Sequence, residues 1–356
     1  MKLLHPQVAA DLSLRWYRYR FLASYIAIGA LSLVLEVGVL RTVEGFGAPR
    51  PYAAVAGIVV GVLVAYYLNA RFNFQIPAAK RTRAFRYFVI ISAFSLALNW
   101  TLKARLAALG WSYERSRFTS SAVLFLVAYA LHRRFSFHDR KQLGIAVYVD
   151  RAEDIRGIWE KVGVFPNFIH LDLVDESVKP GVQPVAANRA EVARAFWPDK
   201  PLHVHIMSKT PSRWLPDVLP YCDVVIVHLD LDEPLGPVLD AIRAARREAG
   251  LCLRTTDSPE ALRPWLGYIQ YVLLLAIAEP GRSGQEQDPR VRAHVQTING
   301  WRERELLTLC VDGGVNERTI TQLDVEHAVS ASSVLNNPDP KRQILRLQTG
   351  SAYDAT

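Results

Sequence analysis

The sequence predicts a multi-domain chain: a four-helix transmembrane bundle (all-α) followed by an α/β (β/α)8 TIM barrel. Two observations predict this combination. Long apolar runs with few acidic residues are confined to residues 21–135, whereas residues 144–350 have the composition of a soluble α/β domain. In the second part, short β-branched runs alternate with amphipathic stretches, which is typical of repeated βα units. We expect the membrane domain over residues 1–141 and the barrel over residues 142–356.

Four apolar segments are long enough to cross a bilayer, whose hydrocarbon core of ~30 Å requires about 20 residues of helix. They are Phe21–Val43, Tyr52–Phe72, Tyr87–Leu109 and Phe118–Phe135. The first segment is longer than the apolar core of a signal peptide, and no small-residue cleavage site follows it. We therefore expect a retained anchor.

The net charge of +8 arises from basic residues that flank the apolar segments. They precede the first segment, separate the second from the third, and follow the fourth: Arg15, Arg18, Arg20, Lys80, Arg81, Arg83, Arg86, Arg133, Arg134, Arg140 and Lys141. Because basic loops stay in the cytoplasm, this pattern predicts a multi-pass protein of the inner (plasma) membrane with a cytoplasmic N-terminus and barrel. No aromatic platform interleaves with the charges, so we expect no nucleic-acid partner. The three cysteines show no CxxC spacing, so neither a disulfide framework nor a zinc knuckle is expected.

The membrane part contains an internal repeat. The heptapeptide Leu68–Phe74 (LNARFNF) at the end of the second segment returns as Leu131–Phe137 (LHRRFSF) at the end of the fourth, 63 residues later. The same offset relates Glu36 in the first segment to Asn99 in the third. We therefore expect two hairpins of the same orientation that form a pseudo-symmetric bundle.

Polar residues of this bundle are candidate site residues. Glu36 inside the membrane predicts either a site for a polar head group or for protons, or a structural hydrogen bond to Asn99. Arg71 and Arg134 predict interfacial anchors, which we favour, or alternatively a phosphate clamp at the cytoplasmic face. With Asn69, Arg71 and Phe72 in its Asn-x-Arg-Phe-x-Phe ending, residues 16–140 resemble the GtrA-like family of small membrane proteins. That resemblance implies a lipid bilayer and a polyprenyl-phosphate sugar or a glycosyltransferase as partners.

Eight short runs in the second part are candidate strands, and helical stretches such as Glu153–Val162, Leu235–Glu248 and Arg290–Arg302 separate them. The strands are Ile145–Val149, Phe168–Leu173, Leu202–Met207, Val224–His228, Leu251–Thr255, Tyr271–Ala276, Leu306–Val311 and Glu326–Val329. Eight units in about 200 residues predict a compact barrel. The alternative, a doubly wound sheet, would place a Gly-rich turn after the first strand, and the sequence has none there.

Ionisable residues lie at the ends of three candidate strands. His170 and Asp172 are spaced i, i+2 on the second strand, and His205 lies on the third. Asp312 follows the seventh strand. Because strands of a barrel end at one mouth and alternate residues share a face, these two imidazoles and two carboxylates can converge. Such a set suits one divalent metal ion, Zn²⁺, Fe²⁺ or Mn²⁺.

Loops after the last three strands carry glycine and serine and are candidates for binding a phosphate. They contain Gly281, Gly284 and Gln285 after the sixth strand, Gly313 and Gly314 after the seventh, and Ala331 and Ser332 after the eighth. Glycine allows the backbone N–H groups to approach an anion closely. The alternative is that these segments are plain tight turns.

These motifs together resemble ribulose-phosphate 3-epimerase over residues 144–347. The matching pieces, in order, are His170-x-Asp172-x-x-Asp175, His205-Ile206-Met207 with Pro211 and Trp214, His228, Pro280-Gly281-x-x-Gly284-Gln285 and Val311–Gly314. The resemblance implies that His170, Asp172, His205 and Asp312 bind one divalent metal. It implies that Asp172 and Asp312 transfer protons on opposite faces of a ketose phosphate through an enediolate. Met207 and His228 would contact the substrate, although simple packing explains Met207 almost as well.

The sequence also departs from that family. No serine ends the first strand, Ala276 stands where the family has Met, and Ala331 stands where the family has Gly. These departures alter the substrate walls, so either the sugar phosphate differs from ribulose 5-phosphate or the activity is weak. Because the metal and proton-transfer residues are complete, we expect a membrane-tethered ketopentose-phosphate epimerase of the ribulose 5-phosphate to xylulose 5-phosphate type, linked to cell-surface polysaccharide or lipid-linked sugar synthesis. The alternative is a non-catalytic sugar-phosphate-binding barrel that regulates a translocation domain. A third possibility is a transporter subunit in which the barrel only docks. Related barrels often self-associate, so a homo-oligomer is possible.

Overall fold

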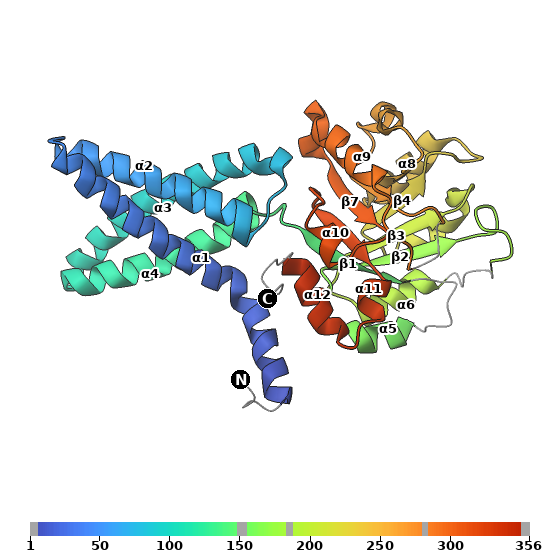
Figure 1. The fold of residues 1–356 in the computed structure, drawn as a ribbon, viewed down its shortest axis with the longest axis horizontal. Helices are drawn as coiled ribbons and strands as arrows, with labels where there is room; N and C mark the ends of the chain where they lie inside the picture. The colour runs from blue at the N-terminus through green and yellow to red at the C-terminus, as the bar shows by residue number, and fades with distance from the viewer. Residues whose placement is uncertain (1–5, 148–154, 183–187, 280–283, 350–356) are drawn as a thin grey trace. The chain divides into compact units, whose positions relative to one another are not determined.

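The structure, a computed structural model, describes residues 6–147, 155–182, 188–279 and 284–349. The chain divides into two compact units, residues 1–140 and 141–356. The first is helical and the second contains all the strands (Figure 1).

The first unit contains four long helices, which are α1 (Pro6–Gly45), α2 (Arg50–Leu68), α3 (Arg81–Ala108) and α4 (Tyr113–Leu131). Within the described residues, three stretches are long and apolar enough to cross a membrane: Tyr19–Gly45, Arg50–Asn73 and Ala78–Ala108. The expected fourth span, Phe118–Phe135, overlaps α4, which begins at Tyr113 and ends at Leu131. The basic residues Arg115 and Arg117 lower the hydropathy of the first turns of α4. A fourth span therefore stays a prediction.

Two π-helical turns lie at the positions of the sequence repeat. They are η1 (Asn69–Asn73) after α2 and η3 (His132–Ser136) after α4, and 63 residues separate them. The next residue in each copy, Phe74 and Phe137, is buried, and the two rings stack with centroids 4.5 Å apart. The two copies of the heptapeptide thus meet through equivalent aromatic residues.

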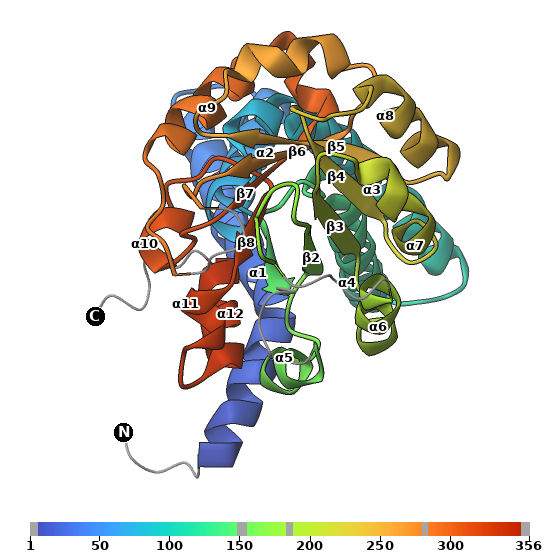
Figure 2. The same cartoon turned by 90° about the vertical axis from the view of Figure 1, so that its right-hand side faces the viewer.

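The second unit is a closed barrel of eight parallel strands paired in chain order (Figure 2). The strands are β1 (Gln142–Val147), β2 (Phe168–Val174), β3 (Leu202–Met207), β4 (Val224–His228), β5 (Glu248–Arg254), β6 (Tyr271–Leu275), β7 (Thr308–Asp312) and β8 (His327–Ser330). The closed order confirms the predicted (β/α)8 barrel and excludes the doubly wound sheet. Helices cover its outside, and the longer ones are α5 (Ile155–Val162), α6 (Arg189–Phe196), α8 (Leu235–Ala244), α9 (Arg290–Asn299) and α12 (Pro340–Thr349).

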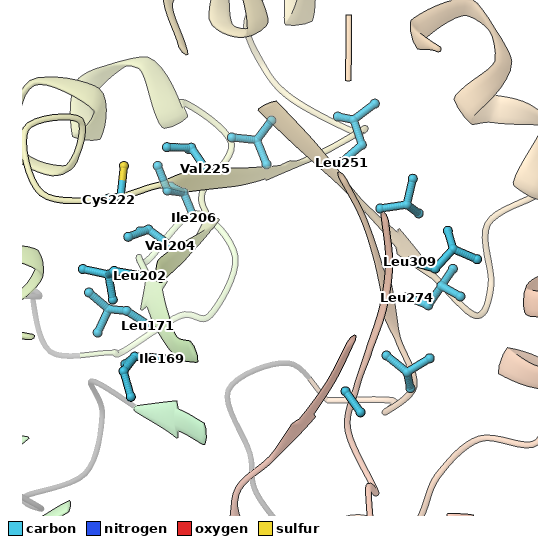
Figure 3. Close-up of a cluster of buried hydrophobic side chains, with 14 of the residues drawn as sticks. Ile169, Leu171, Leu202, Val204, Ile206, Cys222, Val225, Leu251, Leu274 and Leu309 are labelled. Carbon is cyan, nitrogen blue, oxygen red and sulfur yellow. The ribbon is translucent and has the colours of Figure 1, made fainter. Parts of the chain in front are cut away.

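Alternate residues of each strand face two different environments. The outward side chains form the main apolar core under the helices, with Leu171, Val204, Val225, Leu251 and Leu309 among them (Figure 3). The inward side chains form a second, smaller core inside the barrel, lined by Phe168, Ile226, Cys252, Tyr271, Leu273 and Cys310. Because side chains alternate between the two faces along each strand, only every second residue points into the barrel and can reach its mouth.

Several predicted boundaries were wrong. The helix predicted over Leu235–Glu248 ends at Ala244, because Arg246 adopts a φ of 58° that no helix continues, and β5 then begins at Glu248. The helix predicted over Arg290–Arg302 ends at Asn299, before Gly300.

At the seventh strand, Leu306 belongs to a 3₁₀ turn over Arg302–Leu306, so β7 starts at Thr308 and includes Asp312. The eighth strand begins one residue later than predicted, at His327, and includes Ser330. The predicted end of the first strand, Val149, and the start of the first barrel helix, Glu153, lie outside the described residues.

Candidate functional site

The strand register brings ligands from three strands to the barrel mouth. Asp172 on β2 is the register partner of His205 on β3, so the two side chains point inward at the same level. His170 lies two residues before Asp172 and faces the same interior. Asp312 is the last residue of β7 and approaches from beyond β1 and β8. One ligand atom from each of these four buried residues lies within 4.8 Å of the others.

The shortest distances inside this four-ligand cluster involve Asp172. Its Oδ1 is 3.2 Å from His170 Nε2 and 3.2 Å from His205 Nδ1. Oδ2 of Asp312 is 3.9 Å from His170 Nε2. Asp172 therefore joins the two imidazoles, while Asp312 completes the cluster from the opposite side.

The donor set fits a divalent metal ion. Both ring nitrogens of His170 are buried; within the described part of the chain Nδ1 has no hydrogen-bond partner, and Nε2 faces only the carboxylates of Asp172 and Asp312. A buried polar atom without a partner is costly, and a bound ion would satisfy it. Imidazole nitrogen and carboxylate oxygen bind Zn²⁺ at about 2.0–2.2 Å, so small side-chain rotations would bring the four atoms around one ion.

The two carboxyl groups of the cluster have different proton affinities in the metal-free protein. Burial alone would raise the pKa of Asp172, but the neighbouring His170 and His205 outweigh this effect and lower it to about 2. Burial and the carboxylate of Asp172 raise the pKa of Asp312 to about 7. Burial lowers the pKa of His205. Asp172 is therefore the carboxyl group that ionises more readily, and Asp312 is the one that holds a proton more readily.

A cavity of about 450 Å³ adjoins Asp312, and residues of the loops after β6, β7 and β8 line it. It is lined by the predicted phosphate-binding residues Gly284, Gln285, Gly313, Gly314, Ala331 and Ser332. Gly314 has a φ of +63°, and a Cβ there would lie 2.4 Å from the backbone nitrogen of Gln287. Only glycine fits this close approach of two loops.

The remaining predicted barrel residues that the structure describes lie around the same mouth. Met207 ends β3 and is buried. His228 ends β4, and its Nε2 is 3.0 Å from His205 Nε2. The side chain of Gln285 exchanges two hydrogen bonds with the backbone of Glu279 and so closes the loop after β6. Gly281 lies outside the described residues.

Asp175, the last residue of the His170-x-Asp172-x-x-Asp175 motif, connects two loops at the rim of the mouth. It accepts hydrogen bonds from Ser177 and from the Nε1 of Trp214, and it forms an ion pair with Arg213 at 2.8 Å. These contacts tie the loop after β2 to the turn after β3. Asp175 thus holds the rim of the mouth in shape.

The predicted membrane-unit residues do not form one cluster. Asn69 donates to Ala65 O and accepts from Asn73, so it stabilises the π turn. Arg71 and Arg134 are exposed, so neither belongs to a buried cluster with Asn69.

Glu36 packs against two glycines of α2 rather than bonding to Asn99. A Cβ on Gly57 would lie 2.6 Å from Glu36 O, and one on Gly61 would lie 3.3 Å from Glu36 Oε2. Among the described residues no hydrogen bond joins Glu36 to Asn99, whose buried Oδ1 has no partner.

Three residues at the barrel mouth were not predicted from the sequence as site residues: Asn316, Gln287 and Cys252. Asn316 and Gln287 hold Gly314 and Gly313 through their side chains, at 3.2 Å and 3.3 Å from the two carbonyl oxygens. Cys252 lies inside the barrel beside His228. Gln287 and Asn316 each lie two residues beyond a quoted motif, which was the available signal, whereas no motif surrounds Cys252. Loop packing brings the first two to the site, and the strand register brings Cys252 there.

The chain was compared with known proteins. It matches the ribulose-phosphate 3 epimerase family over residues 148–335 and the GtrA/DPMS transmembrane domain over residues 24–137. Ribulose-phosphate 3-epimerase of Chlamydia muridarum (strain MoPn / Nigg) is 28% identical over 192 residues, which cover 51% of this chain and 83% of that protein. The enzyme of Bacillus subtilis (strain 168) is 25% identical over 187 residues, 51% of this chain and 85% of that protein.

Among solved structures, 3-hexulose-6-phosphate synthase matches with a TM-score of 0.45 and 17% identity, covering 59% of this chain and 100% of that one. The family of the barrel matches more than half of the chain, and that family uses a divalent metal. The chain therefore belongs to the ribulose-phosphate 3-epimerase family and carries a GtrA-type transmembrane domain ahead of its epimerase-type barrel.

Proposed function

We propose that the barrel is a metal-dependent epimerase that inverts carbon 3 of a ketopentose phosphate, with ribulose 5-phosphate and xylulose 5-phosphate as the type pair. The observation that carries the proposal is the buried four-ligand cluster of His170, Asp172, His205 and Asp312 within 4.8 Å. These residues would hold one Zn²⁺, Fe²⁺ or Mn²⁺. The ion would supply positive charge beside the substrate oxygens when bound.

The proton transfers fall to the two carboxyl groups. Epimerisation removes the proton from a carbon next to a ketone and returns a proton on the other face, through an enediolate. Asp172 and Asp312 come from strands on different sides of the mouth, which supports one carboxyl group on each face of the substrate. In one direction, one aspartate removes the proton as a carboxylate and the other supplies a proton as a carboxylic acid. The two residues exchange these roles in the reverse reaction.

The substrate's phosphate is assigned to the cavity beside Asp312. Its lining offers backbone N–H groups around Gly313 and Gly314 and the hydroxyl group of Ser332. Backbone N–H groups at glycine loops bind phosphate without a competing side chain. Met207 and His228 would form the opposite wall, and their burial supports a substrate enclosed from water.

The membrane unit would tether this activity to the cytoplasmic face of the inner membrane, where the product feeds lipid-linked sugar synthesis. The support is the GtrA-type domain, with three described helices that are long and apolar enough to cross a membrane, and the basic residues around the start of α3. A polyprenyl-phosphate sugar or a glycosyltransferase is the partner that we propose for that unit.

The test uses the full chain in detergent with Fe²⁺, Mn²⁺ or Zn²⁺ and ribulose 5-phosphate in D₂O, with deuterium entry at carbon 3 followed by NMR. We expect exchange that requires both the metal and each carboxylate, so Asp172→Asn and Asp312→Asn abolish it. The exposed Asp217→Asn is the matched control and keeps it. Exchange that survives Asp312→Asn would contradict the mechanism.

A second candidate is a barrel that binds a sugar phosphate without turnover and regulates the membrane unit. The observation that favours it is the altered wall, since Ala331 lines the cavity where the family has Gly. This candidate predicts saturable binding of ketose phosphates to the metal-loaded chain with no deuterium exchange for any of them.

A further inference from the structure

Three buried side chains on consecutive strands form a second group of metal-ligand type. His205 comes from β3, His228 from β4 and Cys252 from β5, and one ligand atom of each lies within 4.8 Å of the others. His228 and Cys252 are register partners on neighbouring strands. The side chain of Cys252 belongs to the inner core of the barrel, so it faces the two imidazoles rather than the surrounding helices.

His205 can belong to both groups because its two ring nitrogens face different partners. Nδ1 is 3.2 Å from Asp172 Oδ1 in the four-ligand cluster. Nε2 is 3.0 Å from His228 Nε2 on the other side of the ring. The two sites therefore share an imidazole ring without sharing a nitrogen atom.

The geometry and the donor types suit a soft ion. Zn²⁺ binds imidazole nitrogen at about 2.0–2.1 Å and thiolate sulfur at about 2.3 Å, so ligand atoms of a tetrahedral site lie about 3.3–3.6 Å apart. The 3.0 Å between His205 and His228 needs only a small separation to reach this spacing. A thiolate with two imidazoles selects ions such as Zn²⁺ and Cd²⁺ over Mn²⁺, whereas the four-ligand cluster contains two hard carboxylates.

We propose that Nε2 of His205, Nε2 of His228 and Sγ of Cys252 form a second metal site, selective for Zn²⁺-like and Cd²⁺-like ions. Binding displaces the thiol proton of Cys252, because a coordinating thiol is deprotonated. The proton that lies between the two imidazole nitrogens moves from Nε2 to Nδ1 of the ring that carries it, so both imidazoles bind as neutral ligands. Only the thiol proton passes to the buffer, and no electron is transferred. The site goes beyond the proposed epimerase function, because its ligand set includes neither Asp172 nor Asp312.

The first test needs no variant. The full chain in detergent, stripped of metal, is titrated with Cd²⁺, while the thiolate-to-metal ultraviolet band and the ¹¹³Cd NMR spectrum are recorded. The chain has three cysteines, so the background of thiolate ligands is small. We expect the band and a ¹¹³Cd resonance shifted downfield of nitrogen–oxygen coordination. Absence of both in the wild-type chain would overturn the proposal, whether or not the enzyme is active.

Variants then assign the ligands. Cys252→Ser is expected to lose the band, the downfield resonance and one Cd²⁺ per chain. Cys310→Ser is the matched control, since Cys310 is also buried inside the barrel but lies outside both groups. It is expected to keep all three signals. A band that survives Cys252→Ser in a chain with a native circular dichroism spectrum would contradict the assignment.

The double variant Asp172→Asn/Asp312→Asn separates the two sites. It removes the hard ligands of the four-ligand cluster and is expected to abolish deuterium exchange while the thiolate band remains. Loss of the band together with the exchange would show that the cysteine has no site of its own. Failure of the epimerase proposal alone would leave the band intact.

Discussion

At the scale of single residues, Asp312 connects the metal cluster to the phosphate cavity. Its carboxyl group is one of the four buried ligands, and it also lines the cavity formed by the loops after β6, β7 and β8. Burial and the neighbouring Asp172 raise its pKa to about 7 in the metal-free protein. Its protonation state therefore depends on pH near neutrality.

A pH dependence of metal binding follows. A divalent ion binds the carboxylate form, so below about pH 7 a proton on Asp312 competes with the ion. The apparent affinity should fall by about tenfold or more per pH unit below pH 7 and be flatter above it. Competition with a chromophoric chelator between about pH 5.5 and 8 measures this. An affinity that stays constant from about pH 6 to 7 would contradict the raised pKa.

The second residue-scale prediction concerns Gly314→Ala. The new Cβ would meet the backbone of Gln287 at 2.4 Å, and a φ of +63° adds a strain of about 1–3 kcal/mol. We expect weaker substrate binding, by about tenfold or more in KM, with metal affinity unchanged. Gly181→Ala is the control, because Gly181 has a similar φ of +75° but open space around it. Equal changes of KM in the two variants would show that backbone strain, rather than the contact between the two loops, weakens substrate binding.

At the scale of elements, α1 and α2 cross closely because glycine leaves room for the backbone of the partner helix. A Cβ on Gly57 would lie 2.6 Å from the carbonyl oxygen of Glu36, which cannot rotate away as a side chain can. Small residues at such contacts are typical of membrane helix pairs.

Gly57→Ala should therefore lower the thermal stability of the first unit, by about 1–3 kcal/mol in the free energy of unfolding, as overpacking does. Gly38→Ala on α1 is the control: nothing lies within 4 Å of a Cβ there. Alanine also favours helix more than glycine does, so this variant should be neutral or slightly more stable. Melting curves of the purified chain in detergent compare the two, and identical midpoints would count against a tight crossing.

Another element-scale feature is the buried ion pair at the start of β7 and β8. The guanidinium of Arg304 donates to both oxygens of Glu326 at 2.7 and 2.9 Å, and Glu326 accepts from the backbone nitrogen of Leu309. Both side chains are almost fully buried. The pair thus joins the 3₁₀ turn before β7 to the residue before β8.

Removing one partner should leave a buried charge without its counterpart. Arg304→Met is expected to destabilise the barrel by about 3–5 kcal/mol. Adding Glu326→Gln should recover part of the loss, because the neutral amide oxygen can still accept from Leu309. Denaturant unfolding of the single and double variants measures the stability lost with Arg304→Met and the part regained with Glu326→Gln. A double variant no more stable than the single one would argue against a penalty from the unpaired charge.

At the scale of the whole molecule, the basic residues Arg81, Arg83 and Arg86 in the first turns of α3 predict which face of the membrane is cytoplasmic. A cysteine introduced by Arg83→Cys should react with impermeant maleimide only from the cytoplasmic side. One introduced by Ala48→Cys, between α1 and α2, should react from the outside. The three native cysteines are buried, so background labelling is low. Labelling of the intact-cell exterior at position 83 would reverse the proposed orientation.

The sequence by itself determined the two-part architecture and the barrel class, because both depend on patterns that every segment carries locally. Apolar length identifies a membrane helix, and a period of two identifies a strand with two faces. The spacing of His170 and Asp172 therefore already implied a shared face. Element ends were less predictable, because a residue such as Arg246, at a φ of 58°, ends α8 without any turn motif.

Only the tertiary structure decided which residues meet. The strand register sets Asp172 beside His205 and His228 beside Cys252, and register depends on the pairing of whole strands rather than on any local pattern. The approach of the loops at Gly314 and Gln287 likewise arises from the packing of segments that are distant in the sequence. The sequence showed the individual ligands, whereas the pairing of β3, β4 and β5 placed Cys252, a residue of the inner core, beside His205 and His228.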